Sequence, residues 1–158
     1  MKDTQTWGNA IRHAVPTGTL AAALVALTAG SLGKLESGRA IAPINAISHI
    51  LWGDHAARRV KPSLKYTGTG LALNELASVF WGVIYAKFFG LAARRGNVAK
   101  ALAGGAAVAA AAYVTDYHLV PKRLTPGFEK RLSGRALFGV YAAMALSMSA
   151  GALLRRRR

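Results

Sequence analysis

The sequence contains no cysteine among its 158 residues. Disulfide bonds, thiolate nucleophiles and cysteine-ligated zinc sites are therefore excluded, although the redox compartment stays undetermined. Acidic residues are also scarce, because 6 Asp and Glu stand against 21 Lys and Arg, and the formal net charge is +15. The chain also lacks a Walker phosphate loop, a dinucleotide-binding glycine motif in a strand–helix unit and a G-x-S-x-G nucleophile elbow.

The excess of positive charge has two physical interpretations, nucleic-acid binding and contact with a membrane surface. Hydrophobic residues make up 53% of the chain and are gathered into blocks, with the basic residues clustered at the block ends. That arrangement is typical of charges that flank membrane spans. We therefore expect anionic lipid headgroups as partners and no nucleic acid.

What the sequence does contain is long apolar runs, of which residues 136–154 are the clearest. This uncharged run ends at Arg155, Arg156, Arg157 and Arg158. As a helix rising about 1.5 Å per residue, it would cover most of a bilayer core about 30 Å thick. The arginines would stop at the lipid surface, because a cation at the bilayer centre costs at least about 2.5 kcal/mol. The run therefore predicts a membrane span.

Three further apolar blocks predict three more spans. The expected fold class is all-α, an integral membrane four-helix bundle in which residues 1–158 form a single transmembrane domain. The block at 98–120 is the weakest predicted span, because its uncharged centre is mostly Ala and Gly. The predicted spans are residues 14–33, 67–90, 98–120 and 134–154. The last helix is expected to begin before its apolar run, with Thr125 as the cap and Pro126 at the first helical position.

The first block has an alternative interpretation as a cleaved signal peptide, with Lys2 and Arg12 as the basic region. Its apolar run is longer than the roughly 7–15 residues of a signal core, which favours a span. Pro16 would then lie in the first helical turn, where a missing N–H does no harm.

Small residues recur every four positions in each predicted span. In the second span they form an unbroken ridge on one helix face, Gly70, Asn74, Ser78, Gly82, Ala86 and Gly90. Small side chains let helix backbones approach closely in lipid. We therefore expect a compact bundle with close helix crossings.

Four spans would place both termini on one side of the membrane. The basic residues of that side lie in the shorter segments, which weigh most in the positive-inside rule. The sequence therefore favours cytoplasmic termini.

The connection between the first two spans predicts a short helix over residues 43–52, started by Pro43 and ended by Gly53. It is too short to span a bilayer, so it should lie in the interface or re-enter partway. The spacing places Ile44, Ile47 and Leu51 on one face, and Asn45, Ser48, His49 and Trp52 on another.

Two clusters of cations suit the phosphates of lipid headgroups. One follows the short helix and the other ends the chain. They comprise Arg58, Arg59, Lys61 and Lys65, and Arg155, Arg156, Arg157 and Arg158.

Histidines and carboxylates also gather in the two longer connections, which should share one membrane face. Such side chains bind zinc, iron or manganese, and they transfer protons. The candidate metal ligands are His49, Asp54, His55, Glu75, Asp116 and His118, and the candidate catalytic residues are Glu75, His49, Asp116 and His118.

No spacing among these residues matches an established local metal site. Asp116 and His118 lie two positions apart and would point apart on a helix. Interfacial acids and histidines more often pair with nearby arginines or the backbone. We therefore predict no cofactor, with a divalent metal ion as the alternative.

Glu75 stands out because it falls within a predicted span, leaning toward the ridge of small residues. An intramembrane carboxyl suggests a function by default. It could be a proton relay, a cation site, or a neutral acid that is hydrogen-bonded to Asn74 or to another helix.

Three strings in the chain resemble a family of small bacterial inner-membrane proteins that has no assigned activity. They are A-P-I-N-A-I-S-H-I-L-W-G-D-H-A-A-R-R, P-S-L-K-Y-T-G-T-G and V-T-D-Y-H-L-V-P-K-R-L-T-P-G-F-E, and the similarity runs from about Ser37 to Tyr141. The resemblance implies a bacterial envelope location and a four-span build, and it carries over no catalytic residue.

Three classes of function follow. The leading one is a non-enzymatic membrane protein that packs against lipid or against another membrane subunit. The alternatives are a membrane-embedded metal or acid–base enzyme that uses the His/Asp loops and Glu75, and a small proton-coupled carrier that works as a homo-oligomer. Convergence of Glu75 with the loop histidines and acids would favour chemistry, and scatter would favour the first class.

Overall fold

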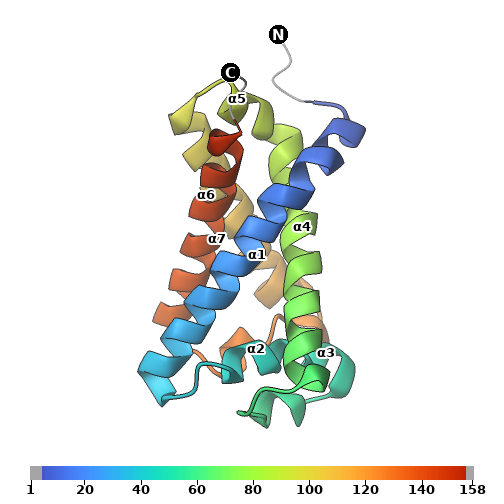
Figure 1. Ribbon diagram of the computed structural model, residues 1–158, viewed down its shortest axis with the longest axis vertical. Helices are drawn as coiled ribbons and strands as arrows, with labels where there is room; N and C mark the ends of the chain where they lie inside the picture. The colour runs from blue at the N-terminus through green and yellow to red at the C-terminus, as the bar shows by residue number, and fades with distance from the viewer. Residues whose placement is uncertain (1–4, 156–158) are drawn as a thin grey trace.

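A computed structural model describes residues 5–155, and within that range the chain is helical and has no strand (Figure 1). Four long helices run along the molecule: α1 (Trp7–Ser37), α4 (Thr69–Phe88), α6 (Val98–Val114) and α7 (Gly134–Leu154). Three short helices accompany them: α2 (Ala42–Ile47), α3 (His49–Trp52) and α5 (Gly90–Arg94). The connections hold five helical turns: η1 (Ala56–Arg58), η2 (Leu64–Gly68), η3 (Thr115–Leu119), η4 (Lys122–Leu124) and η5 (Phe128–Lys130).

The long helices pack in the order α4, α1, α7, α6, with α1 crossing obliquely between α4 and α7 (Figure 1). Helix α1 begins and α7 ends at the same end of the bundle, together with α5. Helices α2 and α3 lie across the opposite end, which we call the loop end. The loop end is closed by the two long connections, 38–68 and 115–133.

Helix boundaries follow local capping chemistry. The hydroxyl of Thr6 caps α1, and Gly38, with φ of 70°, ends it in the left-handed region that glycine adopts at least cost. Ser133 caps α7 through a hydrogen bond of 3.2 Å to the amide of Ala136. The bounds of α7 match the predicted apolar segment 134–154. The prediction that this helix begins earlier, with Thr125 as its cap and Pro126 at its first position, is wrong, because residues 128–130 form the separate turn η5.

The first helix is longer than predicted, extending from residue 7 to residue 37 rather than from 14 to 33. The expectation that Pro16 occupies the first turn is wrong, because the Thr6 cap starts the helix more than two turns earlier. Pro16 lies inside α1, where it leaves one backbone carbonyl without its helical donor.

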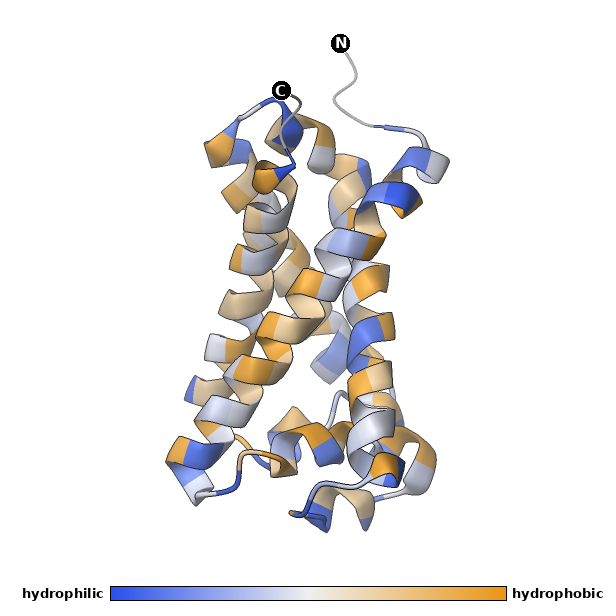
Figure 2. Cartoon of the chain, viewed as in Figure 1, coloured by the Kyte–Doolittle hydropathy of each residue, from blue (hydrophilic) through white to orange (hydrophobic). Residues whose placement is uncertain are grey.

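Within residues 5–155, three helical segments are long and apolar enough to cross a membrane: Trp7–Ser37, Val98–Leu119 and Gly134–Leu154. Helix α4, which contains most of the predicted second span, is not one of them. The prediction that residues 98–120 form the weakest span is therefore wrong, because the mean hydropathy of that segment is higher than that of α4. The alanines of α6 keep its mean high, whereas Asn74, Glu75 and Lys87 lower that of α4. Figure 2 shows hydrophilic residues at both ends of the molecule and one hydrophilic turn midway along α4.

The predicted small-residue ridge of α4 is buried along its whole length, Gly70, Asn74, Ser78, Gly82, Ala86 and Gly90. Glycines of other helices also bring backbones into contact at helix crossings. A Cβ on Gly18 of α1 would lie 2.6 Å from the Cα of Val79, and a Cβ on Gly105 of α6 would lie 2.4 Å from the carbonyl oxygen of Ala145. Both contacts are too short for any side chain, so glycine sets these crossing distances.

Polar side chains tie the long helices together by hydrogen bonds to backbone carbonyls. The Asn74 amide donates to the carbonyl of Ala22 at 2.8 Å, joining α4 to α1. The hydroxyls of Tyr85 and Ser149 both donate to the carbonyl of Ala101, at 3.2 and 2.9 Å. One α6 carbonyl therefore receives donors from α4 and from α7.

The predicted helix over 43–52 is divided in two at Ser48, and Gly53, with φ of 81°, ends it. The expected division into an apolar face and a polar face is wrong. Ile44, Ile47, Asn45, Ser48 and His49 are all buried, while Leu51 is 57% exposed. The reason is that α2 has the bundle on one side and η1 and η5 on the other, so no face of it meets solvent.

Candidate functional site at the loop end

Asn45 fixes the first connection beneath the bundle. Its side chain has no exposed surface, and its Nδ2 donates to the carbonyls of Arg59 and Lys61, both at 3.0 Å. Its Oδ1 accepts from the hydroxyl of Thr67 at 2.6 Å. One buried amide therefore positions the segment that carries the predicted headgroup cations.

Three basic residues fasten the second connection to the first. Arg123 donates through Nε to the carbonyl of Ile50 at 3.1 Å, and Arg131 donates through Nε to the carbonyl of Ala57 at 2.5 Å. The Lys130 ammonium lies 2.9 Å from Oδ1 of Asp54. That hydrogen bond and charge lower the pKa of Asp54 below its ordinary range, so Asp54 is an exposed ion-pair partner.

His49 is completely buried in α3. Its Nδ1 lies 2.9 Å from the carbonyl oxygen of Ala46, and because a carbonyl only accepts, Nδ1 carries the hydrogen. Gly127, with φ of 87°, packs against this pair, and a Cβ there would lie 2.5 Å from the Ala46 oxygen and 2.9 Å from Nδ1. The Nε2 of His49 has no hydrogen-bond partner among the described residues.

Asp116 is turned into the bundle by η3, a π-helical turn that continues α6. Its Oδ2 accepts a hydrogen bond of 2.6 Å from the hydroxyl of Tyr141 on α7. His118 is exposed, and its ring centroid lies 5.9 Å from that of Tyr113. Asp116 is therefore bonded to α7, whereas His118 packs against Tyr113 at the exposed side of η3.

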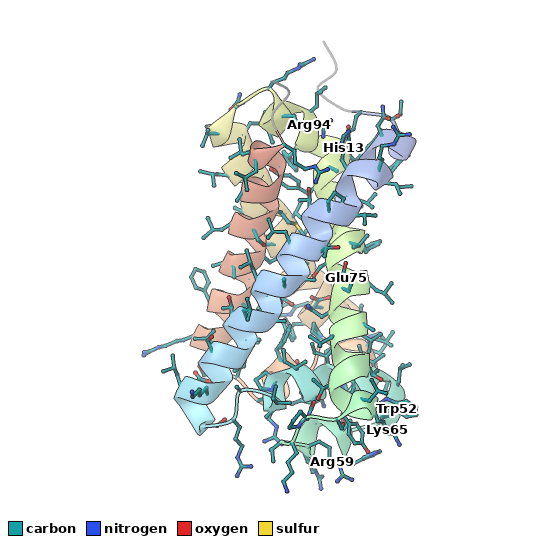
Figure 3. All side chains as sticks on the ribbon, in the orientation of Figure 1. His13, Trp52, Arg59, Lys65, Glu75 and Arg94 are labelled. Carbon is teal, nitrogen blue, oxygen red and sulfur yellow. The ribbon has the colours of Figure 1, made fainter. Side chains whose placement is uncertain are left out.

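Glu75 lies away from the loop end, halfway along α4 (Figure 3). Its Oε1 accepts a hydrogen bond of 2.5 Å from the hydroxyl of Thr19 on α1. Of the hydrogen-bond partners considered for Glu75, the structure shows one on another helix, whereas Asn74 donates to the carbonyl of Ala22. Within residues 5–155, no group of three or more His, Asp or Glu side chains is arranged to hold a metal ion.

The first connection presents a surface of cations and aromatic rings, which we call the basic–aromatic surface (Figure 3). The Lys65 ammonium lies 4.6 Å from the ring centroid of Trp52, and the Arg59 guanidinium lies 5.4 Å from that of Tyr66. The exposed ring of His55 stands edge-on to Tyr66 at 6.1 Å. The residues of this surface are Trp52, His55, Arg58, Arg59, Lys61, Lys65 and Tyr66.

All four predicted headgroup cations of this surface, Arg58, Arg59, Lys61 and Lys65, are exposed. Of the second predicted cluster, Arg155 is exposed at the opposite end, and Arg156, Arg157 and Arg158 lie outside the described residues.

The sequence analysis missed three polar residues beside Asp116. The carboxyl of Glu129 acts electrostatically on both Asp116 and Tyr117. Its Oε1 accepts from the hydroxyl of Thr125 at 2.6 Å. Its Oε2 and the Tyr117 hydroxyl are buried without a hydrogen-bond partner among the described residues. The available signal was the spacing of Thr125 and Glu129, four positions apart in the second connection.

Comparison with known proteins adds no relative from which a role could be transferred. No family model matches the chain, and neither a curated protein nor a solved structure is significantly similar to it. The loop end therefore has to be interpreted from its own geometry.

Proposed function

We propose that this chain is a four-span protein of the bacterial inner membrane, with both termini in the cytoplasm. Helix α4 is the fourth span in this proposal, although it is not among the three described segments that are long and apolar enough to cross a membrane by length and composition. Its packing along α1 and the buried Asn74 bond to Ala22 support insertion, because a helix partner shields polar groups from lipid.

The α2–α3 pair then lies at the outer interface as a short re-entrant element.

The protein acts without catalysis in this proposal, by binding anionic lipid headgroups at the loop end. The observation that carries it is the basic–aromatic surface, in which Lys65 and Arg59 extend over Trp52 and Tyr66. Tryptophan and tyrosine favour the headgroup level, and exposed cations there attract lipid phosphates. Asn45 fixes the backbone at Arg59 and Lys61, which supports a preformed surface.

The test is lipid selectivity of the full chain in nanodiscs that contain phosphatidylcholine with a minority of phosphatidylglycerol or cardiolipin. The test variant replaces four cations of the surface with Gln: Arg58, Arg59, Lys61 and Lys65. The control removes the same charge from the same end, at exposed positions away from Trp52 and Tyr66: Lys34, Arg39, Lys122 and Arg135.

Native mass spectrometry then counts the anionic lipids retained by each form. We expect the test variant to lose about tenfold or more in preference for anionic lipid, because each cation contributes on the order of 1 kcal/mol at a charged surface. The control should lose much less. Equal losses of preference in the test and control variants would mean that net charge alone causes the effect. No loss in the test variant would mean that the surface is not a headgroup site.

A further inference from the structure

A cavity of about 300 Å³ lies between α4 and α7, above the loop end. Val25 of α1 forms one wall, and Ile47 and Ile50 of the short helices lie at its base. Leu76 of α4 also lines it and is 67% exposed, so the cavity opens sideways, toward lipid in the proposed topology. Its volume is at the lower end of the range for small-molecule sites, roughly 300–1,000 Å³.

The charge inside this cavity has the opposite sign to the charge of the chain. Asp116 is the one charged residue among those lining it, in a protein with 21 Lys and Arg. Glu129 lies close enough to add a second negative potential. Within residues 5–155 neither carboxyl forms an ion pair with Lys or Arg, and both are held by hydroxyls, of Tyr141 and Thr125. A cation is therefore favoured at this position, and an anion is repelled.

The other residues that line the cavity favour an organic cation over a metal ion. Aromatic rings of Trp81, Phe128 and Tyr141 line the same space. Aromatic faces attract organic ammonium groups, and the apolar remainder of the lining would solvate a hydrocarbon body. A metal ion fits poorly, because it would find one carboxylate and no cluster of ligands among the described residues.

We infer that this cavity binds a lipophilic organic cation, with its ammonium group at Asp116 and its apolar body toward Trp81. The inference does not depend on the basic–aromatic surface, which lies on the exposed side of the first connection. It adds a ligand of opposite charge at a separate site.

The test measures binding of benzyltrimethylammonium to the full chain in nanodiscs by equilibrium dialysis, with empty nanodiscs as background. A neutral isostere, neopentylbenzene, has the same shape with carbon in place of the charged nitrogen. We expect saturable binding of the cation, and binding of the isostere that is no greater than in empty nanodiscs.

Three variants locate the site. Asp116→Asn keeps an acceptor for Tyr141 and removes the charge, and it should weaken cation binding at least about tenfold. Asp54→Asn makes the same chemical change at an exposed acid outside the cavity, and it should leave cation binding unchanged. Ala77→Phe fills the cavity from its exposed α4 wall without altering a polar group, and it should abolish binding.

Because Ala77→Phe tests the cavity independently of Asp116, the result does not rest on one variant that could fail to fold. Equal, saturable binding of the neutral isostere would mean that the cavity takes an apolar chain such as a lipid tail, and this would overturn the inference. Absence of saturable cation binding to the unaltered protein would overturn it as well, and so would equal weakening by Asp116→Asn and Asp54→Asn.

Discussion

Asn45 shows how one residue can organise a loop of some twenty others. Its side chain is fully buried and makes three hydrogen bonds, to the carbonyls of Arg59 and Lys61 and with the Thr67 hydroxyl. A surface loop without such a bond would leave these carbonyls to water. Here the amide replaces water and gives the loop a single conformation.

Replacing Asn45 with Ala should therefore loosen the first connection. Three hydrogen-bonding groups would lose their partner in a buried site, at a cost of roughly 2–3 kcal/mol. We expect a lower midpoint of thermal unfolding in detergent and faster proteolysis within 56–66. Asn9→Ala removes an exposed amide from α1 and is the matched control. Similar proteolysis of the two variants would contradict this role for Asn45.

At the residue scale, the sequence predicted which residues lie near the site better than it predicted their hydrogen-bond partners. His49 and Asp116 both lie toward the loop end, as their connections required. The partners Ala46 and Tyr141 could not be predicted from composition. Tyr141 is 25 positions from Asp116, and the π-helical turn that brings them together depends on packing against α7.

At the scale of the helices, the small-residue ridge of α4 determines how closely its neighbours approach. The tightest point is Gly70, where a Cβ would lie 2.1 Å from the carbonyl oxygen of Ile44 in α2. The backbones of α2 and α4 are in contact there, which keeps the short helices beneath the bundle.

Gly70→Ala should separate α2 from α4 and lower stability by about 1–3 kcal/mol, as expected for overpacking of a tight site. Gly134→Ala is the control, because a Cβ at that position in α7 meets nothing within 4 Å. It should leave stability unchanged or raise it by up to about 1 kcal/mol. Thermal unfolding of both variants in one detergent measures the difference, and equal midpoints would contradict the contact at Gly70.

At the scale of the whole molecule, the proposed topology places the loop end outside the cytoplasm and the ends of α1 and α7 inside it. The absence of cysteine makes this directly testable, since any introduced thiol is the single reactive one. Suitable exposed positions are Lys61 and Lys122 at the loop end, and Asn9 and Val98 at the other.

In intact cells, a membrane-impermeant maleimide should label Lys61→Cys and Lys122→Cys. It should label Asn9→Cys and Val98→Cys only after permeabilisation. The reverse pattern would mean the opposite orientation. Labelling of Lys61→Cys and Lys122→Cys from different sides would mean that the chain crosses the membrane an odd number of times between them. That result would contradict the four-span proposal.

The sequence by itself determined the helical class, the three apolar segments within residues 5–155 that are long enough to cross a membrane, and the C-terminal end of the last long helix. These properties depend on hydropathy and capping, which are local along the chain. The tertiary structure alone decided that α2 has no exposed face, that Glu75 bonds Thr19 apart from the loop acids, and that Asp116 lines a cavity with aromatic rings. Each of these joins residues distant in sequence, and such contacts depend on how whole helices pack.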